Sequence, residues 1–594
     1  MSEYRSLYRN IGMETVGLPT HNHSRVKNRK PIFTVAIALL TLGVADICIA
    51  ENSSGVPESA LITSPLKSIH SWWKGDSMSA DCIGLASPLQ NNGFTIRGTV
   101  REISFGQLSG GVPNVRQVNW VNEEELGADY DFGTKLGLEG LIAESNWRYR
   151  SVNGSQNTAW VANAAGGGGY MFSPSKDNTG LGMRIMTQFL QWSSDRSDDP
   201  RFRIKAGWIN PYEDFFRQPE DWFFENNALS GYKGISAVSP GQGAIYDHCP
   251  NGAPLYNTVA PIPWSSSYAA WGGELRMKPS ATTYVMTALT GAQAGYNGTQ
   301  TFVTTPVNVY PFTPVAPQYA GQLKSGQYTY TTVNPNGSPR TGSTTGSVTP
   351  YNNHGFNFQG TSSYQGGYTG LYSVNEIGWT PILGPERLNG KYAMGAILYG
   401  QNYTKLSGPY QNIGGQNYAL NQCNVAWDLY FQADQRLTSM HTSSRTLDPL
   451  YKDHTAPAKI TSDSTRGLYF SSSFVVAPPY QSTLPYYFQT GFTFHGPMDA
   501  RPNDTVGIAL GCGFYSSTYN SYVKNVLNGP GSNATAGYKP IPNFTSTQVL
   551  EAFYNIQLNQ WLQFRPDAQY IINPFGNGTV GNDWVIGAEL MAKF

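Results

Sequence analysis

The chain has 594 residues, a formal net charge of zero, and charged and aromatic fractions of 13% each. Soluble domains carry about 25% charged residues, so this protein avoids charge. Its mean hydropathy of −0.35 excludes a protein built from membrane-spanning helices. Residues 1–50 hold six basic and three acidic side chains, which leaves 33 basic and 36 acidic side chains after them, and no nucleic-acid partner is expected.

The first expected element is a secretory signal peptide over residues 1–50, with an unusually long n-region. Its apolar run, residues 31–44, is shorter than the about 20 residues that a membrane-spanning helix needs. Basic residues precede this run, and small residues lead to a cleavage site after Ala50. A retained membrane anchor is the alternative. Residues 51–90 are then expected to form a short N-terminal periplasmic segment.

From residue 91 to residue 594, apolar and polar residues alternate repeatedly with the period of two that marks β-strands. In the stretch 201–208, for example, one face is apolar and the other carries Arg201, Arg203 and Lys205. Such stretches run for about 8 to 12 residues, which is the length that a tilted strand needs to cross a bilayer. The predicted strands are 94–105, 132–142, 181–192, 201–208, 271–278, 281–290, 391–400, 426–435, 466–476, 486–494, 505–515, 549–558, 562–572 and 584–594.

A soluble β-sandwich shows the same alternation, so the membrane interpretation depends on further features. The apolar faces often end in Trp, Tyr or Phe, as in the aromatic girdles of outer-membrane barrels, and the polar faces carry charges of both signs, which suits a water-filled lumen. We therefore predict an all-β fold, a transmembrane antiparallel β-barrel. The stretch 584–594 is expected to close it, with Glu589 and Lys593 facing the lumen or its rim.

The connections between these strands alternate between short and long. Residues 559–560 form a tight turn, whereas 573–583 is long and rich in Gly and Asn. Short periplasmic turns and long extracellular loops are typical of outer-membrane barrels. The segment 438–465 falls on the short-turn side and fits this layout poorly, which raises the alternative that one strand is misplaced. A Thr-, Pro- and Gly-rich stretch, about 292–352, is predicted to be an extracellular loop insertion.

The sequence contains no pattern of an enzyme active site. G-x-S-x-G, H-E-x-x-H, Walker A and paired-Cys motifs are absent. The acidic neighbours Glu213–Asp214 and Glu220–Asp221 resemble catalytic pairs, but glycoside hydrolysis needs two carboxylates at a fixed separation on rigid elements. We expect no enzyme, no cofactor and no metal site.

Four cysteines follow residue 50, and an oxidising compartment would permit a disulfide between two of them. Cys512 lies on the apolar face of a predicted strand and is expected to act as a small hydrophobic residue. Cys249 and Cys423 lie in loop-like sequence and are the favoured pair, while Cys82 has no assigned partner.

The stretch 467–517 resembles the carbohydrate-selective porin family (OprB type). There a pair of strands is joined by a turn with the pattern G-P-x-x-x-R-P-x-D-x-x-G, and the residues that match it are Gly496, Pro497, Arg501, Pro502, Asp504 and Gly507. Residues 555–578, 209–229 and 93–111 fit corresponding stretches, although the loops between 230 and 375 look longer than the family's norm. The resemblance implies an outer-membrane barrel of about 16 strands, narrowed by inward loops, through which sugars diffuse.

A neutral sugar presents hydroxyls that both donate and accept hydrogen bonds. A selective lumen therefore needs Arg and Lys donors beside Asp and Glu acceptors, and its binding must be weak enough for release. The strand phase gives these candidate channel-lining residues: Lys135, Glu139, Arg184, Arg201, Arg203, Lys205, Glu274, Arg276, Asp428, Asp434 and Arg565. The loop 212–224 mixes acids and aromatics and is the candidate constriction, through Glu213, Asp214, Phe215, Glu220 and Trp222. A loop anchored in lipid headgroups is the alternative for it.

The resemblance also implies partners and a location. Phe594 matches the C-terminal aromatic signal that the outer-membrane assembly machinery reads in proteins that resemble this one, so carbohydrate solutes, outer-membrane lipid and that machinery are the expected partners. Two rival functions stay open. One is a general or anion-preferring porin, which the cations of 201–208 favour. The other is a surface or adhesion barrel that acts through its Thr- and Tyr-rich loops.

Overall fold

In the computed structural model, the described part of the chain comprises residues 86–111, 118–152, 182–195, 197, 199–230, 270–293, 301–303, 326–333, 339–346, 368–400, 403–413, 416–419, 422–423, 425–440, 465–480, 482, 484–529, 542–578 and 581–593. The chain divides into two units, Met1–Ile69 and His70–Phe594, and these residues all belong to the second. The predicted signal peptide, most of the segment 51–90, Phe594, and the cysteines Cys82 and Cys249 lie outside the described residues, so the predicted disulfide stays a prediction.

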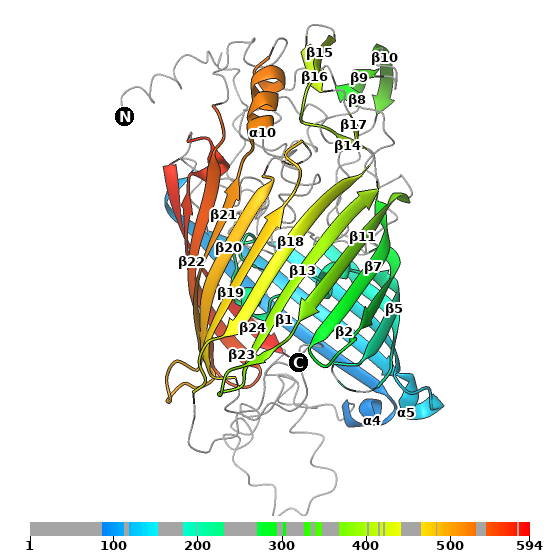
Figure 1. Cartoon of the computed structure of the whole chain (residues 1–594), viewed down its shortest axis with the longest axis vertical. Helices are drawn as coiled ribbons and strands as arrows, with labels where there is room; N and C mark the ends of the chain where they lie inside the picture. Colours follow the sequence, from blue (N-terminus) through cyan, green and yellow to red (C-terminus); the bar gives the residue numbers. More distant parts are fainter. Residues whose placement is uncertain are drawn as a thin grey trace, which may run out of the picture. The chain divides into compact units, whose positions relative to one another are not determined.

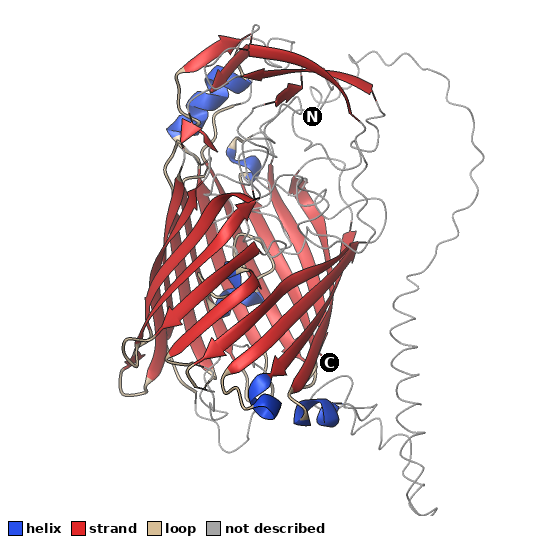
Figure 2. Ribbon diagram, turned by 90° about the vertical axis from the view of Figure 1, so that its right-hand side faces the viewer, coloured by secondary structure: helices blue, strands red, loops and turns tan. Residues whose placement is uncertain are grey.

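Sixteen strands form one closed antiparallel barrel (Figures 1 and 2). Each strand pairs with the next, and β24 pairs with β1, with Lys593 opposite Thr99, to close the ring. The predicted fold class is therefore confirmed. The barrel strands are β1 (Phe94–Gly111), β2 (Val118–Asp131), β3 (Leu141–Val152), β4 (Gly182–Ser193), β5 (Phe202–Ile209), β6 (Ala270–Met277), β7 (Thr283–Gln293), β11 (Tyr368–Trp379), β13 (Leu388–Gly400), β18 (Ala426–Arg436), β19 (Gly467–Val476), β20 (Tyr486–His495), β21 (Thr505–Phe514), β22 (Ser546–Gln557), β23 (Leu562–Ile572) and β24 (Gly581–Lys593).

The alternation of residue types gives the barrel an apolar outer wall and a polar lumen. On β24, the large side chains of Trp584, Ile586 and Leu590 are exposed on the outside, whereas Glu589 is buried on the lumen side. Because successive side chains of a strand point to opposite faces, an alternating sequence presents apolar side chains to the lipid and polar side chains to the lumen from the same strand.

The connections divide as predicted between a short-turn end and a long-loop end. The segment 438–465, which fits the predicted layout poorly, lies between β18 and β19. These two strands pair directly, with Phe431 opposite Phe474. The short-turn end therefore does carry one long connection, and no strand is misplaced there. The loop insertion follows β7 and includes the small sheet of β8 (Thr301–Val303), β9 (Gly326–Val333) and β10 (Pro339–Gly346). The remaining short elements are α4 (Ala86–Asn91), β12 (Ile382–Leu383), β14 (Tyr403–Thr404), β15 (Tyr410–Ile413), β16 (Gln416–Ala419), β17 (Gln422–Cys423), α10 (Ser517–Tyr522), η6 (Val523–Leu527) and η7 (Pro574–Gly576).

One predicted strand is wrong, and three strands were not predicted. Residues 132–142 contain the short helix α5 (Phe132–Leu136) and a turn, because Asp131 caps the helix by accepting from the Gly133 N–H and Gly137 ends it at φ 69°. β2, β3 and β11 escaped the sequence pattern. In β2 the acidic run 123–125 places charges on both faces and hides the alternation.

Candidate functional site

Residues 210–230 follow β5 and lie inside the barrel, where they contact lumen-facing side chains of strands from β5 round to β23, and also Arg101 of β1. We call this segment the strap. Phe215 and Phe216 are buried, and Phe224, Ala228 and Leu229 have no exposed surface. The described side chains of the strap thus pack inside the barrel instead of projecting towards lipid headgroups. The side chain of Trp222 lies outside the described residues.

Two short 3-10 helices give the strap its shape. They are η2 (Pro211–Glu213) and η3 (Pro219–Phe223), and each begins with a proline, whose fixed φ and missing N–H suit the first position of a helical turn. The carbonyl of Asn210 accepts from the Glu213 N–H at 3.0 Å. The strap therefore follows a series of tight turns, each closed by hydrogen bonds between residues close together in the sequence.

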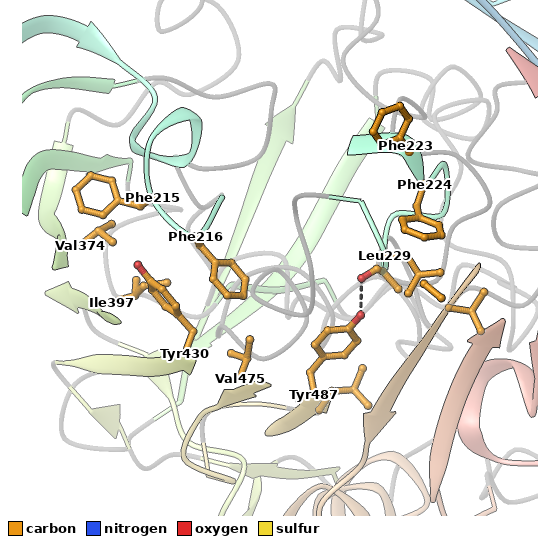
Figure 3. Packing of buried hydrophobic residues seen from close by; sticks show 14 of the residues in the cluster. Phe215, Phe216, Phe223, Phe224, Leu229, Val374, Ile397, Tyr430, Val475 and Tyr487 are labelled. Atoms are coloured by element: carbon orange, nitrogen blue, oxygen red, sulfur yellow. Dashed lines mark hydrogen bonds between the residues drawn. The ribbon is translucent and has the colours of Figure 1, made fainter. Parts of the chain in front are cut away.

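Aromatic side chains attach the strap to the barrel wall (Figure 3). The ring of Phe216 lies 4.4 Å from that of Tyr430 on β18. Phe223 stacks on Phe553 of β22 at 5.6 Å, and Phe224 meets the same ring edge-on at 5.0 Å. Such pairs contribute about 0.5–1.5 kcal/mol each beyond their buried area.

Polar side chains of the wall form hydrogen bonds with several polar groups of the strap. The buried carboxylate of Glu376, on β11, accepts the Phe216 N–H at 2.8 Å and the hydroxyls of Tyr284 and Tyr430 at 2.6 Å each. Gln218 of the strap donates to Asp434 at 2.9 Å. These contacts remove the cost of burying unpaired polar groups and so fix the strap in one place.

The second helix of the strap is held by β20. Glu220 accepts a hydrogen bond from the Thr493 hydroxyl and lies 2.8 Å from Nε2 of His495. Asp221 accepts from the Gln489 side-chain amide at 2.9 Å. Loss of solvation raises the pKa of the Glu220 carboxyl, but the interactions with His495 and Thr493 outweigh it and leave this pKa below its usual range.

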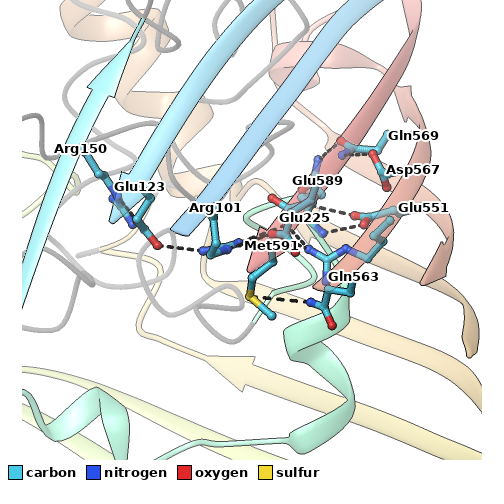
Figure 4. A network of polar contacts seen from close by, with 12 residues as sticks. Arg101, Glu123, Arg150, Glu225, Glu551, Gln563, Asp567, Gln569, Glu589 and Met591 are labelled. Carbon is cyan, nitrogen blue, oxygen red and sulfur yellow. Dashed lines mark hydrogen bonds and ion pairs between the residues drawn. The ribbon is translucent and has the colours of Figure 1, made fainter. Parts of the chain in front are cut away.

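The end of the strap enters a network of buried ion pairs with the closing strands of the barrel (Figure 4). The Glu225 carboxylate forms ion pairs with Arg565 of β23 and, at 3.4 Å, with Arg101 of β1. Glu589 contacts both arginines, at 2.5 Å for Arg101 and 3.0 Å for Arg565. Glu551 accepts the backbone N–H groups of Glu225 and of the next residue at 2.6 and 2.8 Å.

The start of the strap is bound to β5 and β6 through Asp214. Its carboxylate contacts Arg203 at 2.7 Å and Lys205 at 2.5 Å, and Arg203 also contacts Glu274 at 2.9 Å. Loss of solvation would raise the pKa of Asp214, but Lys205 and Arg203 outweigh it and hold this pKa well below its usual range. The pKa of Glu213 is raised to about 8, because loss of solvation and the Glu144 carboxylate both disfavour its charged form.

The structure distributes the sequence-predicted site residues unevenly. Six of them are buried on the lumen face of the wall, namely Arg203, Lys205, Glu274, Asp428, Asp434 and Arg565. Arg276 pairs with Asp199 at 2.6 Å near the short-turn end, and Arg201 is exposed before β5 begins. Arg184 lies on β4, and its side chain is outside the described residues. Lys135 and Glu139 are exposed in the turn around α5, so the expectation that they line the lumen from a strand is corrected.

Sequence reasoning missed most of the wall groups that hold the strap. Arg101 sits on a predicted strand but was not singled out, and Glu123 and Glu376 lie on β2 and β11, which were not predicted. Alternation alone could have placed Arg101 on the lumen face. Nothing in the sequence pairs it with Glu225, because that contact joins residues 124 positions apart.

The described ranges contain neither a metal-binding cluster nor a helix that could cross a membrane. Within them no group of three or more His, Cys, Asp and Glu side chains is arranged to hold a metal ion. No helix in the described part of the chain is both long and apolar enough to cross a membrane.

An apolar outer wall, a polar lumen and an inward strap define the class: this is a porin-type barrel, and such barrels occupy the bacterial outer membrane. The profile of the family described as "Carbohydrate-selective porin, OprB family" matches residues 125–594. The chain belongs to this family. Family and fold are those of a channel rather than of an enzyme.

Individual relatives are more distant. Porin B of Pseudomonas aeruginosa is 26% identical over 251 residues, which are 41% of this chain and 48% of that protein. The putative porin QuiX of Acinetobacter baylyi is 27% identical over 140 residues, 22% of this chain and 30% of its own. The chain thus aligns with about half or less of these relatives. The high-pH structure of Pseudomonas putida OprB shares the fold, with a TM-score of 0.58 at 18% identity over 88% of this chain and 99% of that one.

Proposed function

We propose that the protein forms a passive outer-membrane channel for small neutral saccharides, in which the strap sets the constriction. The observation that carries this proposal is the pairing of the lumen cations beside the strap. Arg203 and Lys205, whose strand favoured an anion channel, both contact Asp214. Arg101 and Arg565 both contact Glu225 and Glu589.

Paired charges suit a neutral solute better than an ion. Each ion pair offers donors and acceptors side by side, as sugar hydroxyls require, while its net field at the channel axis is small. The family's description and the carbohydrate-selective pattern around Arg501 support the same cargo. Mono- and oligosaccharides remain the expected substrates, with the bilayer and the assembly machinery as further expected partners.

Liposome swelling tests the proposal. Vesicles containing the purified barrel should swell faster in glucose than in gluconate or glucosamine, which have similar size but opposite charges. Short oligosaccharides should enter more slowly than glucose, because the strap narrows the lumen. Equal rates for glucose and gluconate would contradict carbohydrate preference, and vesicles that stay impermeable would favour a surface protein without transport.

A further inference from the structure

A groove crosses the outer wall of the barrel on β19 to β23, which are neighbouring strands (Figure 1). Its volume is about 520 Å³, and small-molecule sites commonly have roughly 300–1,000 Å³. The outward side chains that line it are apolar apart from the Tyr554 hydroxyl, and among them are Phe492, Phe494, Val506, Ile508, Ala552 and Ala568. We call it the wall groove.

Small outward residues create the wall groove among larger ones. On β22, Ala552 lies on the outward face between Leu550 and Tyr554, and its register partner on β23 is Ala568. Ile508 of β21 pairs with Ala552 from the other side and is 48% exposed. The two alanines therefore form the floor of the groove, and an apolar chain that fills it gains contacts with the larger side chains around it.

The wall groove lies in the half of the membrane that is next to the short-turn end. Phe494 is the last residue but one of β20, and it faces Val506, which is the second residue of β21. Ile508 lies two residues further along β21, about 7 Å from Val506. The short turns of such barrels face the periplasm, so the groove opens into the periplasmic leaflet, which consists of phospholipid.

A fixed guanidinium lies at the short-turn end of the wall groove. Arg501 donates to both carboxylate oxygens of Asp504, from Nε at 2.9 Å and from Nη2 at 3.0 Å, and Nη2 also donates to the Gln557 carbonyl at 3.1 Å. The hydroxyl of Tyr554, whose ring lines the groove, donates to the same carboxylate at 2.7 Å. One buried carboxylate therefore holds the cation and the groove together.

The guanidinium of Arg501 keeps donors for a further anion. Its hydrogen bonds to Asp504 and Gln557 use Nε and Nη2, and the two N–H groups of Nη1 have no hydrogen-bond partner among the described residues. The side chain is 40% exposed, while the paired contact with Asp504 fixes the plane of the guanidinium. A phosphate can therefore bind to Nη1 without displacing a contact of the protein.

We propose that the wall groove and Arg501 form a binding site for one phospholipid of the periplasmic leaflet, with an acyl chain in the groove and the phosphate on Nη1 of Arg501. Tyr554 joins the two parts, because its ring lines the groove and its hydroxyl reaches the polar turn, as aromatic residues do at a membrane interface. A free anion would leave the apolar groove unfilled, and lipopolysaccharide occupies the leaflet at the long-loop end.

Retention of lipid through purification tests the proposal. The full-length protein is extracted from its native outer membrane, washed extensively in a mild non-ionic detergent and measured by native mass spectrometry. The expected result is a folded barrel that carries one phospholipid. A barrel that retains no lipid, only inorganic phosphate or only lipopolysaccharide would in each case overturn the proposal.

Two variants change the two parts of the site separately. Ala568→Trp fills the groove from an outward position, and Arg501→Gln removes the cation. Each should lower the fraction of barrels that retain phospholipid several-fold. Arg501→Gln also takes a partner from Asp504, whereas Ala568→Trp changes no polar group, so the second variant keeps the test independent of that loss.

Each variant has a matched control. Ala396→Trp, at an outward position of β13, and Arg387→Gln, in the exposed turn before β13, should leave lipid retention unchanged. Heat-modifiable migration on a gel verifies that every variant is a folded barrel. Equal retention by Ala568→Trp and Ala396→Trp would refute the acyl-chain site, and equal retention by Arg501→Gln and Arg387→Gln would refute the phosphate contact.

Discussion

The carboxylate of Glu225 forms an ion pair with the guanidinium of Arg565, which lies 340 residues further along the chain. Both side chains are buried, and Glu589 contacts the same guanidinium at 3.0 Å. Because Arg565 and Glu589 lie on β23 and β24, the end of the strap is fixed to the strands that close the barrel. The position of the strap and the closure of the barrel are thus stabilised by the same contacts.

Replacing Glu225 by glutamine should therefore weaken the whole barrel as well as the strap. Arg565 and Arg101 keep Glu589, so the loss is smaller than for a completely orphaned charge. We expect a decrease of about 2–3 kcal/mol in the free energy of unfolding, because one buried pair loses its partner. Equilibrium unfolding in urea, with the protein in lipid vesicles, measures it.

Asp199→Asn is the matched control for that variant. Asp199 also pairs with two cations, Arg276 and Lys278, but its side chain is 41% exposed. Exposed pairs contribute less than about 1 kcal/mol. Equal losses of stability from Glu225→Gln and Asp199→Asn would mean that burial of the network has no special role.

Asp214→Asn should make the channel prefer anions. The change leaves Glu274 as a partner of Arg203 but removes the carboxylate that contacts Lys205, so a net positive charge appears beside the strap. The double change Arg203→Ser and Lys205→Ser should have the opposite effect, because Asp214 and Glu274 remain. Reversal potentials in planar bilayers under a salt gradient report both shifts. Asp195→Asn, in the exposed turn before β5, is the control that should move neither.

The sequence allowed the wall of the barrel to be predicted better than the strap. Strand phase alone directed Lys205, Asp428 and Arg565 to the lumen face, because a period of two leaves no other choice once one face must meet lipid. It failed where local signals were mixed: the cap at Asp131 produced a helix, and the acidic run in β2 concealed a strand. Contacts such as Glu225 with Arg565 depend on how the chain returns through the lumen, which no local pattern encodes.

Gly395→Val should release part of the strap without changing any charge. A Cβ atom at Gly395 would overlap the ring of Tyr430, which lies flat against β13 and donates to Glu376. Displacing that ring also removes its contact with Phe216. We expect a loss of about 1–3 kcal/mol in stability, together with a higher conductance. Gly581→Ala, where nothing lies within 4 Å of an added Cβ, should change neither unfolding nor conductance.

Glu213 should make ion selectivity depend on pH in the mildly alkaline range. Its pKa is raised to about 8, first by loss of solvation and then by the Glu144 carboxylate, so the side chain is neutral at pH 7. As the pH rises through 8, a negative charge appears on the strap, and the reversal potential should move towards cation preference between pH 7 and about 9. The raised pKa of Glu213 also makes the stability of the folded state depend on pH. A raised carboxyl pKa favours the folded state fully below the ordinary value of 4.5, and this contribution is lost as the pH rises to about 8.

The variant Glu213→Gln separates this effect from other titrations. Glutamine keeps the size and the hydrogen-bonding groups of the neutral acid, so the variant should behave at every pH as the unmodified channel does at pH 6. Its reversal potential should therefore stay flat from pH 6 to about 9.5, while glucose permeation is preserved. If the unmodified channel and Glu213→Gln show the same pH dependence, the titrating group lies elsewhere. If neither channel responds to pH, the charge of Glu213 does not change between pH 6 and about 9.5, and the expected titration near pH 8 is wrong.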